Sequence, residues 1–127
     1  MKKVSITHID NRHNQWLRSL QFYKNELQFL KGRLTEIGGK NTGDEVLRQV
    51  EHFENQFKVQ ADNIDRLSHD IRLNIQEAGR QLQQSSAGYV DSNLITRHEQ
   101  LDDAFLTGEK TINELRQEFN RFSATWM

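Results

Sequence analysis

A ladder of mostly apolar residues, alternating at intervals of four and three, runs through the last third of this 127-residue chain. Because an α-helix turns once every 3.6 residues, this spacing places all members of the ladder on one stripe of a long helix. A stripe of this length has to be covered by other helices of the chain or by a second copy. Its members are Leu94, His98, Leu101, Phe105, Gly108, Ile112, Leu115, Phe119, Phe122 and Trp126.

Two earlier segments of the chain carry ladders of the same kind. The chain contains no proline, so nothing in these segments interrupts a long helix. Gly38 and Gly39 are expected to end the first helix in a left-handed cap. We therefore predict helices over residues 8–38, 44–85 and 92–125, within a single domain of residues 1–127. The first ladder comprises Ile9, His13, Trp16, Leu20, Tyr23, Leu27, Leu30, Leu34 and Ile37, and the second comprises Val46, Val50, Phe53, Phe57, Ala61, Ile64, Ser68, Ile71, Ile75, Ala78 and Leu82.

The segments between the predicted helices are short, so neighbouring helices have to run antiparallel. The predicted fold class is all-α, an elongated antiparallel up-down-up three-helix bundle with coiled-coil-like heptad packing. Counting outward from the predicted turns places His13 beside His69, and it places Ser68 and Gly108 near the level of Trp16. We expect Trp16 to fill the space that these two small residues leave, because protein interiors are densely packed. The alternative is that Gly108 only marks a bend.

The charge balance argues against nucleic-acid binding. The chain has 17 basic and 18 acidic residues, a net charge of −1, and these residues are scattered along its length without a basic stripe. It has no cysteine, which excludes disulfides and thiol chemistry. Its first residues lack the apolar segment of a signal peptide, and no stretch approaches the ~20 apolar residues of a membrane span. We expect a cytoplasmic protein with no membrane or small-molecule partner.

No group of residues has the spacing of a catalytic or metal site. The motifs Glu-x-x-His and His-Glu-x-x-His, which hold metals on helices, are both absent. The three ladders contain no Asp or Glu, so no carboxylate site is expected in the core. We predict no catalytic residue, no metal ligand and no cofactor. We interpret His13 and His98, which lie within ladders, as buried polar residues that fix the register; the alternative is a pH switch.

Four apolar residues outside the ladders are candidates for an interface. Phe22 and Phe29 are seven residues apart, on the side of the first helix opposite its ladder. Val59 and Leu73 lie off the second ladder, and Val59 is expected at the level of Phe22 or Tyr23. Contiguous apolar patches mark interaction surfaces, although a wider core within the monomer would also account for the two phenylalanines.

These features favour a non-enzymatic helical scaffold or protein–protein interaction module. We expect it to self-associate through the outer face of the first helix, as a homodimer, or to bind a helical protein partner. One alternative is a metal-binding helical-bundle protein, which facing carboxylates in the core would have supported. The other is a regulator that exposes its third helix to a partner.

Two segments, Trp16–Leu27 and Val50–Phe57, resemble those of an uncharacterised family of small bacterial three-helix coiled-coil-like proteins. The overall layout, with a tryptophan in the first helix, is also similar to a spectrin-type three-helix repeat. These resemblances imply a three-helix fold, and they imply no activity, cofactor or site.

Overall fold

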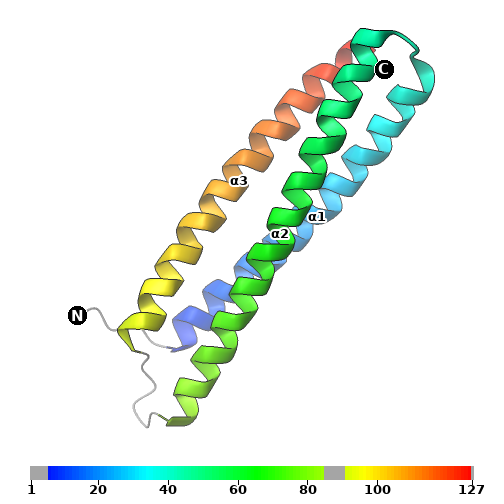
Figure 1. Ribbon diagram of the computed structural model, residues 1–127. Helices are drawn as coiled ribbons and strands as arrows, with labels where there is room; N and C mark the ends of the chain where they lie inside the picture. The colour runs from blue at the N-terminus through cyan, green and yellow to red at the C-terminus, as the bar shows by residue number, and fades with distance from the viewer. Residues whose placement is uncertain (1–5, 85–90, 127) are drawn as a thin grey trace.

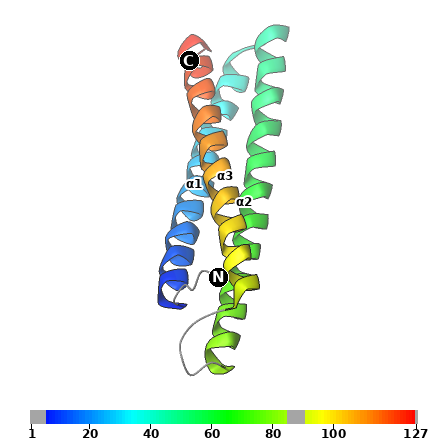
Figure 2. The ribbon, with the colours of Figure 1, turned by 90° about the vertical axis from the view of Figure 1, so that its left-hand side faces the viewer.

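Three long helices lie side by side along the length of the molecule. The computed structural model describes residues 6–84 and 91–126, without the side chains of residues 6 and 7. Helix α1 spans Ile6–Lys40, α2 spans Asp44–Gln84 and α3 spans Ser92–Trp126. Helices α1 and α3 run in one direction and α2 runs in the other (Figure 1, Figure 2). The chain is therefore the all-α, up-down-up three-helix bundle that the ladders predict.

Helix α1 continues two residues beyond its predicted end at residue 38, and α2 begins at Asp44 as predicted. Gly38 and Gly39 are both helical, so the prediction of a left-handed cap at these residues is wrong. The helix ends instead where Asn41 Nδ2 donates to the carbonyl oxygen of Ile37 at 2.8 Å. This side chain satisfies one of the carbonyl groups that the last turn of a helix leaves without a partner.

The start of α3 is held by Asp91. Its Oδ1 atom accepts a hydrogen bond from the backbone N–H of Leu94 at 2.9 Å, which is the usual role of an aspartate before a helix. The backbone N–H of Asp91 donates to Gln81 Oε1, also at 2.9 Å, and so joins the last turn of α2 to the start of α3. The end of the second helix predicted at residue 85 lies outside the described residues.

Helix α1 meets α2 at a different level from the predicted one. His13 Nε2 lies 3.0 Å from Asn74 Nδ2, and Lys24 Nζ lies 2.7 Å from Asp65 Oδ1. The predicted neighbour of His13 is His69, so the prediction of level is wrong and the true neighbour lies five residues further along α2. The loop of residues 41–43 lies within the gap that the predicted helix bounds leave, so most of this difference is an axial offset between the two helices.

The core runs along the centre of the bundle as a main apolar cluster and a smaller one. In α1 the buried residues follow the predicted ladder; in α3 they do so with the addition of Ile95 and Ser123, and a few ladder members of both helices are half-buried. In α2 the polar residues Gln60 and Asn74 are buried, their neighbours Ala61 and Ile75 are half-buried, and Leu82 is exposed. The predicted ladder misses the two polar residues because it passes through their apolar neighbours, Ala61 and Ile75. Four aromatic rings meet toward the first turn, with centroids 5.0–6.1 Å apart: Phe53, Phe57, Phe119 and Phe122.

Candidate functional site

The outer face of α1 carries two exposed phenylalanines. The side chains of Phe22 and Phe29 are 59% and 64% exposed, so a wider monomer core does not cover them. They lie one heptad apart on the side of the helix opposite its buried ladder. Arg18 lies one turn before Phe22, and Arg33 lies one turn after Phe29. We refer to these four residues as the α1 outer stripe.

The polar residues beside this stripe are bound to α3. Glu26 Oε1 accepts a hydrogen bond from Arg116 at 2.8 Å, and the Tyr23 hydroxyl donates to Glu109 Oε2 at 2.6 Å. Burial, followed by this hydrogen bond to a carboxylate, raises the pKa of Tyr23 to about 12, so the hydroxyl keeps its proton. The two arginines of the α1 outer stripe form no ion pair with any described residue.

Val59 and Leu73 do not join the stripe. Each is 41% exposed on α2. The contacts between α1 and α2 place Val59 at the level of Phe29, and the prediction that it lies level with Phe22 or Tyr23 is wrong. Leu73 lies two heptads further along α2. Both are single exposed apolar side chains of a kind that is common on protein surfaces. Two further exposed leucines, Leu47 and Leu106, escape the sequence analysis, and Leu82, predicted as the last member of the second ladder, is also exposed.

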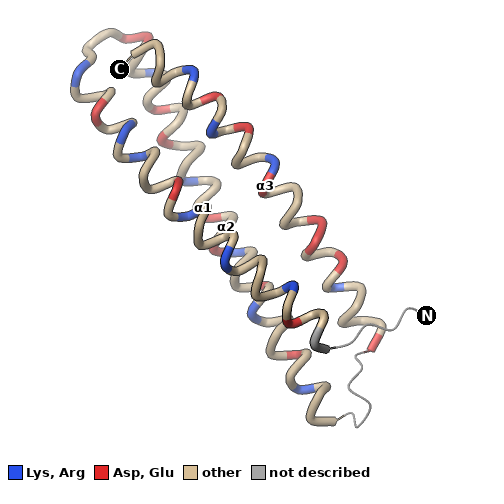
Figure 3. Tube along the Cα trace, turned by 180° about the vertical axis from the view of Figure 1, so that it is seen from behind, with Lys and Arg blue, Asp and Glu red and all other residues tan. Residues whose placement is uncertain are grey.

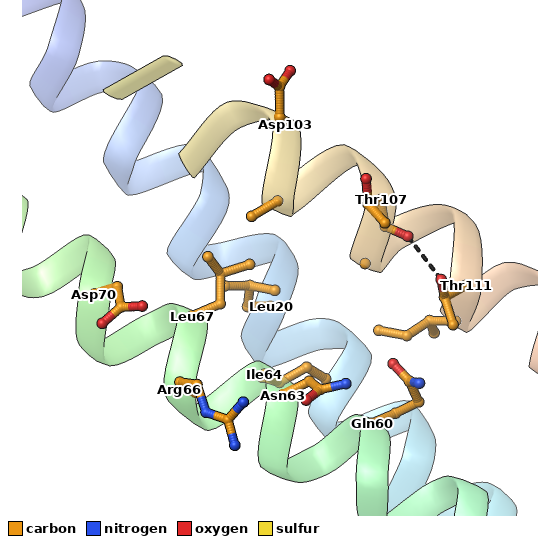
Figure 4. Close-up of a pocket in the computed structure, with 13 residues that line it drawn as sticks. Leu20, Gln60, Asn63, Ile64, Arg66, Leu67, Asp70, Asp103, Thr107 and Thr111 are labelled. Atoms are coloured by element: carbon orange, nitrogen blue, oxygen red, sulfur yellow. Dashed lines mark hydrogen bonds between the residues drawn. The ribbon is translucent and has the colours of Figure 1, made fainter. Parts of the chain in front are cut away.

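A groove of about 460 Å³ lies between α2 and α3, with a largely apolar lining (Figure 4). It is open because α3 contributes the small residues Ala104 and Gly108 on this side. A Cβ atom added to Gly108 would meet no atom within 4 Å. We refer to it as the α2–α3 groove, and its lining residues are Leu20, Gln60, Asn63, Ile64, Arg66, Leu67, Asp70, Asp103, Ala104, Thr107, Gly108, Thr111 and Ile112.

Trp16 does not fill the space beside Gly108. Its indole ring stacks on His98 and Phe105, with ring centroids 5.0 and 6.1 Å apart. The prediction that Trp16 occupies the gap left by Ser68 and Gly108 is therefore wrong, because α1 meets α2 at a different level from the predicted one. Ser68 is buried, and α3 continues as a helix through Gly108.

His13, Asn74 and His98 form a polar layer, with one residue from each helix. His13 and Asn74 are buried, and Asn74 Nδ2 donates to His13 Nε2 at 3.0 Å. His98 is half-buried, and its ring centroid lies 5.4 Å from that of His13. Burial, and to a smaller extent the nearby His98, lowers the pKa of His13 to about 4. Burial and the nearby His8 also lower the pKa of His98, so the layer favours neutral imidazoles.

Four polar atoms in and beside this layer have no hydrogen-bond partner in the described part of the chain. They are His13 Nδ1, Asn74 Oδ1, His98 Nδ1 and Trp16 Nε1. A buried polar atom left without a partner costs about 1–3 kcal/mol of stability. The layer also divides the core, because a small cluster of Ile9, Ala78, Leu94 and Ile95 lies apart from the main one.

The surface of the bundle carries charges of both signs. Basic and acidic residues are both distributed along all three helices (Figure 3). Within residues 6–84 and 91–126, no three His, Asp or Glu side chains are placed to hold a metal ion together. None of the helices, as far as they are described, combines the length and the apolar character that crossing a bilayer requires.

Comparison of the chain with models of protein families, with curated proteins and with solved structures found no match. The resemblance of Trp16–Leu27 and Val50–Phe57 to a bacterial family therefore stays a prediction.

Proposed function

We propose that this chain is a non-enzymatic helical interaction module that associates with further copies of itself through the α1 outer stripe. The observation that carries the proposal is the exposure of Phe22 and Phe29, each more than half in water, on a helix whose opposite face is buried. Covering a phenylalanine side chain is worth about 1.5–3 kcal/mol, so an interface that covers both gains substantial free energy.

The interior of the bundle supports a structural role for its histidines. His13 is enclosed by the amide of Asn74 and the rings of Trp16 and His98. One ring nitrogen of His13 is already bound to an amide that is not a metal ligand, which disfavours the metal-binding alternative. We propose accordingly that the coiled-coil-like bundle is a rigid support for its surface, and that it acts in the cytoplasm.

The regulator alternative requires α3 to leave the bundle. Two bonds between α1 and α3 oppose this step, from Tyr23 to Glu109 and from Arg116 to Glu26. Departure of α3 would also expose Phe105 and Phe119, both of which are buried. These contacts favour an interaction module that keeps all three helices together.

The proposal is tested with the double variant Phe22→Asp/Phe29→Asp in sedimentation velocity. We expect the native chain to associate as its concentration rises and the double variant to remain monomeric, because each aspartate would have to lose its hydration in the interface. Both positions are exposed, so the helix content measured by circular dichroism should be unchanged. The matched control is Leu82→Asp, which alters another exposed apolar residue and should associate like the native chain. A double variant that associates equally well would rule out this surface.

A further inference from the structure

The projecting rings of the α1 outer stripe are complementary in shape to the α2–α3 groove. Phe22 and Phe29 project from a helix and lie about 10 Å apart along its axis, one heptad at 1.5 Å per residue. The groove runs from the level of Asp70 to that of Gln60 on α2, which is about 15 Å by the same rise. The α3 wall of the groove, from Ala104 through Gly108 to Ile112, spans about 12 Å by the same rise, slightly more than the separation of the two phenylalanines.

The charges of the two surfaces are also opposite. Figure 4 shows the carboxylate of Asp70 pointing toward the groove from the α2 wall, whereas the carboxylate of Asp103, on the α3 rim, points away from α2. Neither aspartate forms an ion pair with a basic residue in the described part of the chain. Neither Arg18 nor Arg33 forms one with an acidic residue there. An arginine lies at each end of the stripe, Arg18 before Phe22 and Arg33 after Phe29. A docked stripe can therefore bring one arginine to this acidic end in either direction. Arg66 extends from the α2 wall away from α3 (Figure 4).

Pairing of two identical stripes is disfavoured by the same charges. In an antiparallel two-fold pair, Phe22 of one copy faces Phe29 of the other, and Arg18 then faces Arg33. In a parallel two-fold pair, each arginine faces its own counterpart. Like charges brought face to face are destabilising, so both symmetric arrangements oppose the burial of the phenylalanines.

We propose that the α1 outer stripe of one copy docks in the α2–α3 groove of a second copy, an inference that rests on the self-association proposed above. The stripe and the groove lie on different parts of the molecule, so the contact is heterologous. In a pair of copies, the one that inserts its stripe still has an empty groove, and the one that receives it still has an exposed stripe. Association of the native chain therefore continues beyond a dimer, into a ring or an open chain.

The experiment removes one surface at a time and then mixes the variants. Phe22→Asp/Phe29→Asp lacks the stripe and keeps the groove. Gly108→Arg keeps the stripe and fills the groove, at a position where the structure has open space beside the backbone. Each variant alone should be monomeric in sedimentation velocity. Their equimolar mixture should form a dimer that contains one copy of each, seen as a single mixed species in native mass spectrometry.

Two further variants separate the groove from other effects of the substitution. Gly108→Ala is the matched control, since one methyl group leaves the groove open, and it should associate like the native chain. Asp70→Arg reverses the charge of the wall, and it should weaken association about tenfold. Adding Arg18→Asp and Arg33→Asp to Asp70→Arg should restore association.

The outcomes distinguish this inference from the function on which it rests. If Gly108→Arg and Asp70→Arg associate as well as the native chain while the phenylalanine variant does not, the stripe is an interface and the groove is not its partner. A mixture that stays monomeric, or a Gly108→Ala variant that no longer associates, also overturns the groove. A native chain that remains monomeric at every accessible concentration overturns both proposals.

Discussion

His13 is the residue whose surroundings most oppose its charged form. Asn74 on α2 offers it an amide donor, and His98 on α3 offers an aromatic ring. The nearest base on its own helix, Arg12, lies over Trp16 and is bonded to Asp102 at 2.9 Å, so this carboxylate already has a cationic partner. A proton on His13 would therefore enter a buried site without a compensating negative charge.

We predict that His13 makes the bundle less stable in acid. Its pKa is about 4 in the folded chain and ~6.5 in an unfolded one, so the unfolded state binds more protons between these values. The contribution of His13 to stability is fully present above pH ~6.5 and is lost as the pH falls to ~4, a change of up to about 3 kcal/mol. Urea denaturation at a series of pH values measures the free energy of unfolding directly.

The control for this prediction replaces both hydrogen-bonding partners. In His13→Leu/Asn74→Leu no amide is left without an acceptor, so the double variant should fold and should lose this part of the pH dependence. His69 is exposed, and His69→Asn should retain the dependence of the native chain. An unchanged slope in the double variant would assign the acid sensitivity to other residues.

At the scale of the elements, the end of α1 shows how local signals compete. A Gly-Gly pair is typical of a left-handed helix end, yet α1 continues through Gly38 and Gly39 to an asparagine cap. The buried Ile37 is the last member of its ladder, and Val50 of α2 lies 3.6 Å from a Cβ atom placed on Gly38. Packing against α2 thus reaches the last turn of α1 and supports its helical conformation.

We predict that Gly39→Ala stabilises the protein by about 1 kcal/mol, which is the difference in helix propensity between the two residues. A Cβ atom at Gly39 would meet no atom within 4 Å, so the change adds no clash. Gly32→Ala, in the middle of the same helix and equally open, is the control and should give a similar gain. If Gly39 were a left-handed cap, its alanine variant would lower the denaturation midpoint instead.

At the scale of the whole molecule, the exposed features lie on two different surfaces. Two apolar rings project from one of them, in the α1 outer stripe, and the other is hollowed by the α2–α3 groove. Nothing in the fold requires either feature, because the bundle buries its ladders without them. Their combination is what distinguishes this chain from a bundle that serves only as a spacer.

We predict that the melting temperature of the native chain rises with its concentration. Association stabilises the folded state by mass action, since only folded copies present both surfaces. In Phe22→Asp/Phe29→Asp the melting temperature should not depend on concentration. Differential scanning calorimetry at several concentrations checks this, and equal concentration dependence in both proteins would contradict it.

Much of the fold could be read from the sequence. Leu94 to Trp126 form one helix with its predicted buried stripe. The exposure of Phe22 and Phe29 was one of two alternatives that the sequence left open, because a wider core would also have accounted for them. Gln60 and Asn74 lie at strict heptad spacing from Phe57 and Ile71, but the predicted ladder passes through their neighbours Ala61 and Ile75 instead, because these are apolar. The groove beside Gly108 could not be identified either, since an open groove and a filled one have the same periodicity.

The sequence by itself determined which face of each helix is buried, because heptad spacing is a property of a single helix. The tertiary structure decided how far each helix slides along its neighbours, since that depends on where the first turn pivots and on side chains from all three helices. This level sets His13 beside Asn74 and Trp16 against Phe105. It therefore also leaves Gly108 facing an open groove instead of an indole ring.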